Sequence, residues 1–513
     1  MLVKTFGSAV YGVNAITITV EVNVLSGLGY HIVGLPDNAV KESIRRVESA
    51  LKTNGYRMPR VKLIVNLAPA DLKKSGTAFD LPIAIGTLAA SEQFQIKDQI
   101  ETYVMMGELN LDGTIQPLKG ALPMAITARR EGFQGLIVPK QNAREAAMVN
   151  NLKVYGMGHI NEVLDFLQYP EKVQPVIVNT RDEFLHAQTE FEFDFSEVRG
   201  QENIKRALEI AAAGAHNAIL IGPPGAGKTM LAKRLPGILP PLTLNEALES
   251  TKIYSVAGKL AANATLISKR PFRAPHHSIS DAALIGGGSS PQPGEISLAH
   301  NGVLFLDELP EFRRTALEVM RQPMEERKVT ISRARQSLDF PASFMLLASM
   351  NPCPCGFYNH PDKECTCPAG MVQRYLNKVS GPLLDRIDLH VEVTPVEFTE
   401  LSSIRPAESS ETIRERVIKA RNIQAERFRE NPGVYANAQM DSKQLRIICD
   451  IDNVGQNLLK LAMKKLNLSA RAYDRILKVS RTIADLSASE KIRPEYIAEA
   501  IQYRSLDREG WAG

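Results

Sequence analysis

The sequence predicts an α/β protein with three folded parts: an N-terminal α/β domain, a parallel αβα sandwich and a helical C-terminal lid. Three observations support this prediction. Apolar and polar residues alternate near the N-terminus, buried strands alternate with helices in the middle, and convincing strand patterns end near Pro395. A chain of 513 residues also fits about three domains, at roughly 100–200 residues each.

The composition indicates a folded protein, which we expect in the cytoplasm. Charged residues make up 23% of the chain and apolar residues 44%, which is ordinary for folded soluble proteins. We find no apolar run long enough to span a membrane and no N-terminal cleavage site, so we expect no membrane partner. The net charge of +4 is too small to indicate a nucleic-acid partner, so that argument depends on local charge.

The first predicted domain covers residues 1–168 and mixes strands with helices. Residues 16–24 alternate apolar and polar side chains, as in a strand with one buried face, and residues 61–66 form a second predicted strand. Apolar residues recur at helical spacing over 37–51, after a Pro-Asp start. Residues 169–196 lose this periodicity, so we interpret them as a linker.

The second domain, residues 197–395, contains a phosphate-binding motif between a predicted strand at 218–221 and a helix. Phosphates need close approach of the backbone, so glycines, inward amide groups and a helix N-terminus suit them. Lys228 would supply a cation to the β and γ phosphates of ATP, and Thr229 a hydroxyl to Mg²⁺. The predicted ATP-binding residues are Gly222, Pro223, Pro224, Gly225, Ala226, Gly227, Lys228 and Thr229.

An acidic pair follows the predicted buried strand 303–306. Asp307 would hold Mg²⁺ together with Thr229, and Glu308 would polarise the attacking water. The alternative is a strand end with two solvated carboxylates, which the phosphate-binding loop upstream makes the minor option. A third predicted strand, 344–349, leads to Asn351, whose amide can orient water near the γ phosphate.

Four cysteines form two C-x-C pairs in a short insertion, residues 353–367. The four thiolates of Cys353, Cys355, Cys365 and Cys367 would complete a closed, tetrahedral structural Zn²⁺ site. The spacing is tighter than the usual C-x-x-C, which leaves free or redox-sensing thiols as the alternative. His360 lies inside the loop and is expected to be solvated.

A basic hairpin is predicted between the acidic pair and the third strand. Residues 329–331 can pair with the segment around Leu338, and the hairpin tip would carry cations for the phosphate backbone of DNA. These nucleic-acid candidates are Arg327, Lys328, Arg333 and Arg335. The alternative is a solvated hairpin whose charges pair with Glu325 and Glu326. Upstream, His276 and His277 lack further spaced metal ligands, so we expect a structural or nucleic-acid contact there.

Residues 396–513 are expected to form the helical lid. The clearest helix begins at a Ser469 cap and has an apolar face that includes Tyr473, Ile476 and Leu477. The same helix carries Arg471, Arg475, Lys478 and Arg481, which we interpret as a cationic or ordinary solvated face.

Together these motifs resemble the AAA+ ATPases, and more narrowly the magnesium-chelatase-like YifB or ComM family, over essentially the whole chain. The resemblance implies a homo-hexameric ring with ATP at subunit boundaries. It implies that Asn351 is sensor 1, that Arg386 is the arginine finger for the neighbouring site, and that Arg471 is sensor 2 of the lid. Without the resemblance, Arg386 between carboxylates would be interpreted as an exposed ion pair.

The first domain resembles the Lon protease domain in residues 69–81 and 107–117. Lon chemistry needs a serine activated by a lysine. In the matching register these two positions hold Ala78 and Leu122, while Ser75 and Lys119 each lie three residues away. We therefore expect no protease activity, and a role in substrate gating, ring assembly or binding of a protein partner.

The family resemblance implies a Mg²⁺-dependent DNA translocase or helicase that drives branch migration of recombination intermediates. The basic hairpin and the zinc site are the features that favour this DNA-translocating function. The alternative is a chelatase- or chaperone-type motor that remodels a protein partner. A non-catalytic nucleotide-binding scaffold is disfavoured by the intact set Lys228, Asp307, Glu308, Asn351 and Arg386.

Overall fold

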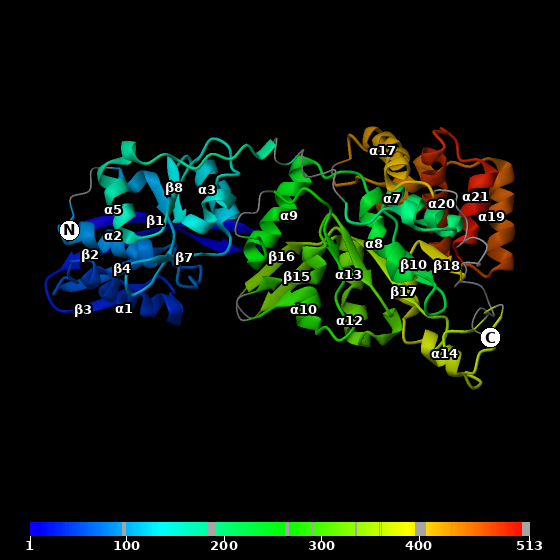
Figure 1. The fold of residues 1–513 in the computed structure, drawn as a ribbon, viewed down its shortest axis with the longest axis horizontal. Coiled ribbons are helices and arrows are strands. Elements are labelled where there is room, and N and C mark those ends of the chain that lie inside the picture. The colour runs from blue at the N-terminus through cyan, green and yellow to red at the C-terminus, as the bar shows by residue number, and fades with distance from the viewer. Residues whose placement is uncertain are drawn as a thin grey trace.

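A computed structural model of the chain shows an elongated molecule with the N-terminal sheet at one end and a group of helices at the other (Figure 1). The structure describes residues 1–94, 99–181, 184, 191–261, 266–288, 291–333, 336–358, 360, 362–395, 407–431 and 433–504, without the side chains of residues 333 and 336.

The N-terminal part is a seven-stranded mixed sheet with helices packed against it, in the order β3-β4-β2-β1-β5-β8-β9. Its elements are β1 (Leu2–Tyr11), β2 (Asn14–Leu25), β3 (Gly29–Val33), α1 (Asn38–Thr53), β4 (Lys62–Ala68), α2 (Asp80–Ala90), β5 (Tyr103–Met105), β6 (Glu108–Leu109), β7 (Ile115–Gln116), α3 (Ala121–Arg130), β8 (Gly135–Pro139), α4 (Ala143–Ala146), β9 (Lys153–Met157) and α5 (Ile160–Gln168).

The predicted elements of this part are confirmed. In β2, Ile18, Val20 and Val22 are fully buried, while the residues between them are more exposed, as period-2 alternation requires. Helix α1 begins after Asp37, whose side chain accepts a hydrogen bond from the Val40 amide at 2.8 Å.

The central part contains a five-stranded sheet in the order β11-β14-β17-β10-β18. The elements of this part are α7 (Glu202–Gly214), β10 (Ala218–Ile221), α8 (Lys228–Ile238), α9 (Leu244–Ala257), β11 (Phe272–Arg273), α10 (Asp281–Ile285), β12 (Gly286–Gly287), β13 (Gln292–Pro293), α11 (Glu295–Leu298), β14 (Val303–Leu306), α12 (Arg314–Val319), α13 (Arg321–Glu326), β15 (Lys328–Arg333), β16 (Gln336–Pro341), β17 (Met345–Met350), α14 (Met371–Leu376), α15 (Gly381–Leu384) and β18 (Leu389–Glu392).

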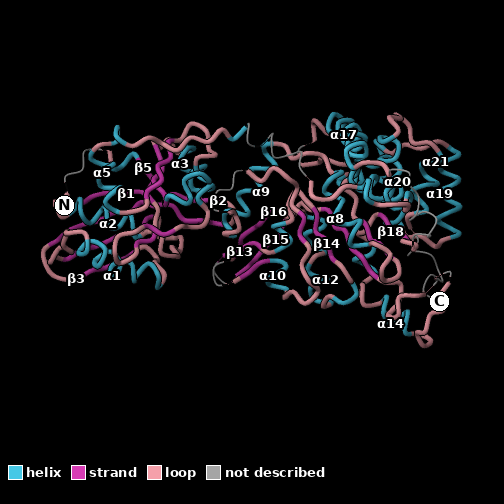
Figure 2. Tube along the Cα trace, in the orientation of Figure 1, coloured by secondary structure: helices cyan, strands magenta, loops and turns pink. Residues whose placement is uncertain are grey.

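All pairings in this sheet are parallel, so the carboxyl ends of its strands meet at one edge. Residues of β10, β14 and β17 are buried on both faces, as expected for a parallel sheet covered by helices. In Figure 2 the strands of this sheet are the magenta segments that lie between the cyan helices.

Asn217, the residue before β10, joins three strands of the central sheet. Its side-chain oxygen accepts a hydrogen bond from the Leu346 amide at 2.8 Å, and its side-chain nitrogen donates to the Arg386 carbonyl at 3.0 Å. Its own amide donates to the Asp388 carboxylate at 3.1 Å. One polar side chain therefore fixes β17 and the start of β18 to either side of β10.

The C-terminal part consists of helices α17 (Ser410–Arg427), α18 (Ser442–Ile448), α19 (Asn453–Lys465), α20 (Ala470–Leu486) and α21 (Pro494–Gln502). The predicted Ser469 cap is confirmed, because its side chain accepts a hydrogen bond from the Ala472 amide at 3.2 Å. Tyr473, expected on the apolar face, is 38% exposed. Among the described helices, none combines the length and the apolar character needed to cross a membrane.

The N-terminal part packs directly on the central part. The turn between β1 and β2 lies against the β15–β16 hairpin, where Val13 joins an apolar cluster that contains Leu338. At a second contact, the Gly120 amide donates to the Ser255 carbonyl of α9 at 3.1 Å. Ser255 also donates a hydrogen bond to Glu145, which accepts the Leu122 amide at 3.0 Å.

The bridging role of Asn217 predicts a specific loss of stability. Asn217→Ala leaves the Leu346 amide and the Arg386 carbonyl without their partners, which costs about 1–3 kcal/mol for a buried group. We expect a lower urea midpoint, followed by circular dichroism. Asn453→Ala on the exposed surface of α19 is the matched control, with an expected change within about 0.5 kcal/mol. Equal midpoints for the two variants would contradict the bridging role.

Candidate nucleotide site

The loop between β10 and α8 is built to approach phosphates closely. Strand β10 ends at Ile221, and α8 begins at Lys228, which places the helix N-terminus behind the loop. Gly227 has φ +83°, in the left-handed region that favours glycine. At Gly222, a Cβ atom would lie 2.3 Å from the Val393 carbonyl oxygen, so only glycine fits there.

Lys228 lies inside this loop and contacts the end of a second strand. Its ammonium group donates to the carbonyls of Gly222 at 2.7 Å and Pro223 at 2.9 Å, and to Asn351 Oδ1 at 3.1 Å. Burial lowers the pKa of Lys228, and the nearby carboxylates of Asp307 and Glu308 oppose that shift. The structure therefore brings together the predicted lysine, the acidic pair and the predicted sensor amide.

Asp307 accepts hydrogen bonds from two hydroxyl groups at the edge of the sheet. The Thr229 hydroxyl donates to Asp307 Oδ2 at 2.7 Å, and the Ser349 hydroxyl donates to Oδ1. A hydroxyl and a carboxylate in contact are oxygen ligands of the kind that Mg²⁺ prefers. Sequence reasoning missed Ser349, although it lies two residues before Asn351 and therefore on the same side of β17.

Glu308 adopts a left-handed backbone conformation with φ 55°, and its side chain remains 57% exposed. One of its carboxylate oxygens lies 3.4 Å from His277 Nδ1. The second of the paired histidines thus contacts the acidic pair, a partner that the sequence did not indicate. A cavity of about 390 Å³ is bounded by the loop, Asp307, Glu308 and Asn351.

The four cysteines converge as the spacing predicted. All four sulfur atoms lie within 4.8 Å of one another, and Cys353 is fully buried. Cys353 Sγ lies 3.7 Å from Cys365 Sγ, close to the roughly 3.8 Å edge of a tetrahedron with Zn–S bonds of about 2.3 Å. His360 does not belong to this group, and its Nδ1 accepts the Asp362 amide at 3.0 Å. The donor set therefore fits a closed metal site.

The cysteine loop touches the phosphate-binding loop. A Cβ atom at Gly356 would lie 2.5 Å from Pro224 Cδ, so the two loops are in contact. Because Cys353 follows Asn351 by two residues, the same segment also connects to the end of β17.

Two predicted site residues lie away from this cavity. Arg386 is only 9% exposed and forms an ion pair with Glu325 at 2.5 Å, so the alternative of an exposed ion pair does not describe it. Arg471 is 64% exposed in its side chain and lies 3.2 Å from Asp385. Neither arginine lines the nucleotide cavity of its own chain.

The predicted hairpin exists, and Ile331 pairs with Leu338 as expected. Its predicted basic tip needs correction, because Arg327 and Lys328 lie at the base. Arg327 ends α13 and donates to the carbonyls of Gly433 and Gln439. Lys328 lies 2.9 Å from the Asp339 carboxylate. The side chain of Arg333 and all of Arg335 lie outside the described residues.

Of the four cations of α20, only Arg471 is largely exposed, so they do not form one solvated face. Arg475 lies 3.0 Å from the Asp388 carboxylate, and Lys478 donates to the Ala438 and Met440 carbonyls. Arg481 is buried and pairs with Asp485 at 3.0 Å. The partners of Arg475 and Lys478 lie far away in the sequence, whereas Arg481 is buried against its own helix and the turn after it.

The two positions matched to the Lon dyad both hold apolar residues in packed surroundings. Ala78 is partly buried against the N-terminal core, and Leu122 is fully buried in α3 at the contact with the central part. Ser75 and Lys119 are both exposed, and neither hydrogen-bonds to the other in the part of the chain that the structure describes.

Comparisons with known proteins agree with these features. Three segments match the family descriptions "Magnesium chelatase, subunit ChlI" (residues 194–401), "Subunit ChlI of Mg-chelatase" (20–142) and "Magnesium chelatase, subunit ChlI C-terminal" (407–504). This family implies a nucleotide and Mg²⁺ as ligands, and the cavity offers side chains suited to both.

Full-length relatives show the same relationship. The chain is 44% identical over 509 residues to competence protein ComM of Haemophilus influenzae, covering 99% of this chain and 98% of the relative. It is 44% identical over 509 residues to YifB of Escherichia coli, covering 98% and 96%. It is also 32% identical over 157 residues to Lon protease 2 of Bacillus subtilis, covering 28% and 27%. The chain therefore belongs to the YifB/ComM family of magnesium-chelatase-like AAA+ ATPases.

Proposed function

We propose that this protein hydrolyses ATP in a Mg²⁺-dependent reaction and uses the energy to translocate on DNA, with branch migration of recombination intermediates as its task. The observation that carries the hydrolysis step is the meeting of Lys228, Thr229, Asp307 and Asn351 at one sheet edge. The DNA step is supported by Arg333 and Arg335 in the sequence of the hairpin and by a full-length relative that is named as a competence protein.

Each side chain has a defined role in this proposal. Lys228 and the loop amides bind the β and γ phosphates, and Thr229 with Asp307 holds the Mg²⁺ shell. Glu308 polarises the attacking water, and Asn351 orients that water. When ATP enters, its phosphates offer Lys228 a partner in place of the Gly222 and Pro223 carbonyls.

Arg386 and Arg471 act in this proposal on the nucleotide of a neighbouring subunit in a homo-hexamer. Their separation from the cavity of their own chain supports a role in trans. A cation at the γ phosphate stabilises the charge that develops during phosphoryl transfer. To reach the nucleotide of a neighbouring subunit, the Arg386 guanidinium must leave its ion pair with Glu325.

DNA contact is assigned to the hairpin tip, with Arg333 and Arg335 as the contributing cations. The β1–β2 turn packs against the same hairpin, so the N-terminal part can sense its position or gate a substrate. The apolar residues Ala78 and Leu122 support a non-proteolytic role for that part.

The second candidate function is a chelatase- or chaperone-type motor that remodels a protein partner. It is favoured by the matches to the magnesium chelatase subunit over three segments of the chain. The two candidates differ in whether DNA or a protein stimulates ATP turnover.

Two substitutions at the nucleotide site should nearly abolish ATP turnover. Lys228→Ala and Glu308→Gln should each lower kcat by at least about a hundredfold, because one loses the phosphate cation and the other the water-polarising carboxylate. Glu308→Gln should still bind a fluorescent ATP analogue. Phosphate release at saturating Mg²⁺·ATP is the measurement. Glu311→Gln, which changes a nearby carboxylate that pairs with Lys378, is the control. Wild-type-like turnover in Glu308→Gln would refute the assigned role.

The same phosphate-release assay, repeated with added DNA, tests the DNA-binding role. Single-stranded or branched DNA should raise wild-type turnover several-fold, and Arg333→Ala/Arg335→Ala should abolish this rise while leaving basal turnover unchanged. Stimulation should also fall steeply with added salt, because the contacts are with phosphates. An ATP turnover rate that added DNA does not change would favour the protein-remodelling motor.

The cysteine group is proposed to hold one structural Zn²⁺. Purified protein should then contain about one zinc per chain, measured by plasma emission spectroscopy. Cys365→Ser should lose the metal and lower ATP turnover, because the cysteine loop contacts Pro224. Cys449→Ser, at the fifth cysteine outside the group, should keep the metal. Metal-free wild-type protein with full turnover would support free thiols instead.

A further inference from the structure

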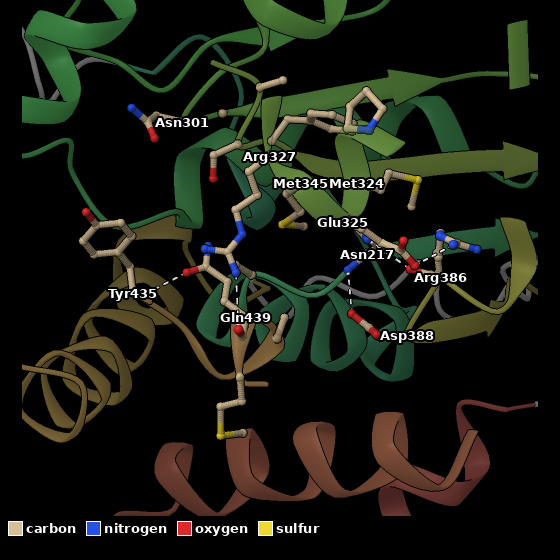
Figure 3. A pocket seen from close by; sticks show the side chains of 18 of the residues that line it. Asn217, Asn301, Met324, Glu325, Arg327, Met345, Arg386, Asp388, Tyr435 and Gln439 are labelled. Atoms are coloured by element: carbon tan, nitrogen blue, oxygen red, sulfur yellow. Dashed lines mark hydrogen bonds and ion pairs between the residues drawn. The ribbon is translucent and has the colours of Figure 1, made fainter. Parts of the chain in front are cut away.

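A second cavity lies between the central part and the C-terminal helices. It encloses about 380 Å³, at the small end of the range for ligand pockets. Figure 3 shows its wall, in which Arg327 of the central part faces Tyr435 and Gln439 of the C-terminal part. The cavity is separate from the nucleotide cavity, since the two share no lining residue.

The four carboxylates in the wall of this cavity all have a partner. Three form ion pairs with arginines of the same wall: Glu246 with Arg270 at 3.1 Å, Glu325 with Arg386 at 2.5 Å, and Asp388 with Arg475 at 3.0 Å. The fourth, Asp441, accepts the Gln444 amide at 2.7 Å as the N-cap of α18.

Three further cations in the wall have no such partner. Among the described residues, Arg327, Arg421 and Lys478 form no ion pair, and their hydrogen bonds go to backbone carbonyls. Arg327 donates to Gly433 at 2.5 Å and Gln439 at 3.3 Å, Arg421 to Ala212 at 3.3 Å and Tyr435 at 3.2 Å, and Lys478 to Ala438 at 3.1 Å and Met440 at 2.5 Å. An arginine has five N–H donors, so each guanidinium keeps donors unused.

The charged forms of these groups are disfavoured in the present arrangement. Burial lowers the pKa of Arg421 to about 9 and, together with the neighbouring Arg475, lowers the pKa of Lys478 to about 8. Burial also lowers the pKa of Arg327. Glu246 opposes the pKa shift of Arg421, and Asp388 opposes that of Lys478, but both carboxylates already pair with other arginines of the wall, so a further anion would stabilise the charged forms.

We propose that this cavity binds a small phosphate-bearing anion of the diphosphate type, held by Arg327, Arg421 and Lys478. A tetrahedral phosphate has acceptor oxygens in several directions, which suits cations that enter the cavity from three different elements. A planar carboxylate could meet fewer of them. Free pyrophosphate and the diphosphate of a nucleotide share this chemistry.

Binding there would connect the lid to the hairpin. Arg327 immediately precedes β15, whereas Arg421 lies on α17 and Lys478 on α20. An anion shared by the three side chains would therefore tie the base of the β15–β16 hairpin to two lid helices. This inference does not depend on ATP hydrolysis or on DNA binding.

The test is isothermal titration of inorganic pyrophosphate into the full chain carrying Lys228→Ala, which weakens phosphate binding at the first loop. We expect one binding event, weakened about tenfold or more by adding Arg421→Gln or Arg327→Gln, because each removes charged donors. The matched control is Arg429→Gln, at an exposed arginine just beyond α17, and it should leave the affinity unchanged.

Two results would overturn the proposal: no pyrophosphate binding to the Lys228→Ala protein, or an affinity that neither Arg421→Gln nor Arg327→Gln lowers relative to the Lys228→Ala protein. Circular dichroism checks that each variant is folded, and either arginine alone suffices if the other variant fails to fold. Competition by ADP in the same background would identify a nucleotide diphosphate as the occupant. Binding that ADP leaves unchanged would identify the free inorganic anion.

Discussion

The rest of the nucleotide site depends on one constraint, which is that parallel strands end at the same edge of a sheet. Strands β10, β14 and β17 are neighbours and all run in one direction, so the residues after them meet although they lie far apart in sequence. The contacts between Thr229 and Asp307 at 2.7 Å and between Lys228 and Asn351 at 3.1 Å follow from this arrangement. At the opposite end of β10, Asn217 connects this strand to β17 and to the segment before β18.

Direct contacts connect this edge of the sheet to the other parts of the chain. The cysteine loop joins the end of β17 to Pro224, so a rigid metal site there would hold the phosphate-binding loop and the Asn351 amide together. In the other direction, α12 and α13 lead from the acidic pair to the β15–β16 hairpin. That hairpin contacts the N-terminal part through Leu338 and the lid through Arg327. The hairpin and the residue before it therefore contact both of the other parts.

Local sequence patterns predict the strands, helix caps and hairpin whose structure is determined by residues close together in the sequence. The bounds of β10 and β14 agree with the predicted strands, because each is a short apolar run followed by a motif with fixed geometry. The Asp37 and Ser469 caps were found for the same reason. The pairing of Ile331 with Leu338 followed from alternation in two adjacent strands.

Predictions failed where a side chain's partner is remote in sequence. Arg327 was placed at a hairpin tip, yet its guanidinium contacts carbonyls at Gly433 and Gln439. For Arg386, the alternative of an exposed ion pair overlooked Glu325, against which the guanidinium is buried. The contact of His277 with Glu308 depends on β11 lying beside β14, which no local pattern reveals. Charged residues were the most difficult to place, because hydrophobic periodicity does not determine their partners.

The most direct test of the proposed function is strand exchange on a synthetic four-way DNA junction with ATP and Mg²⁺, followed on a native gel. The account predicts that the wild-type protein converts the junction into duplex products, and that Lys228→Ala and Glu308→Gln leave it intact. If the wild type hydrolyses ATP but neither binds nor moves the junction, the DNA motor is contradicted and a protein-remodelling motor is the better explanation.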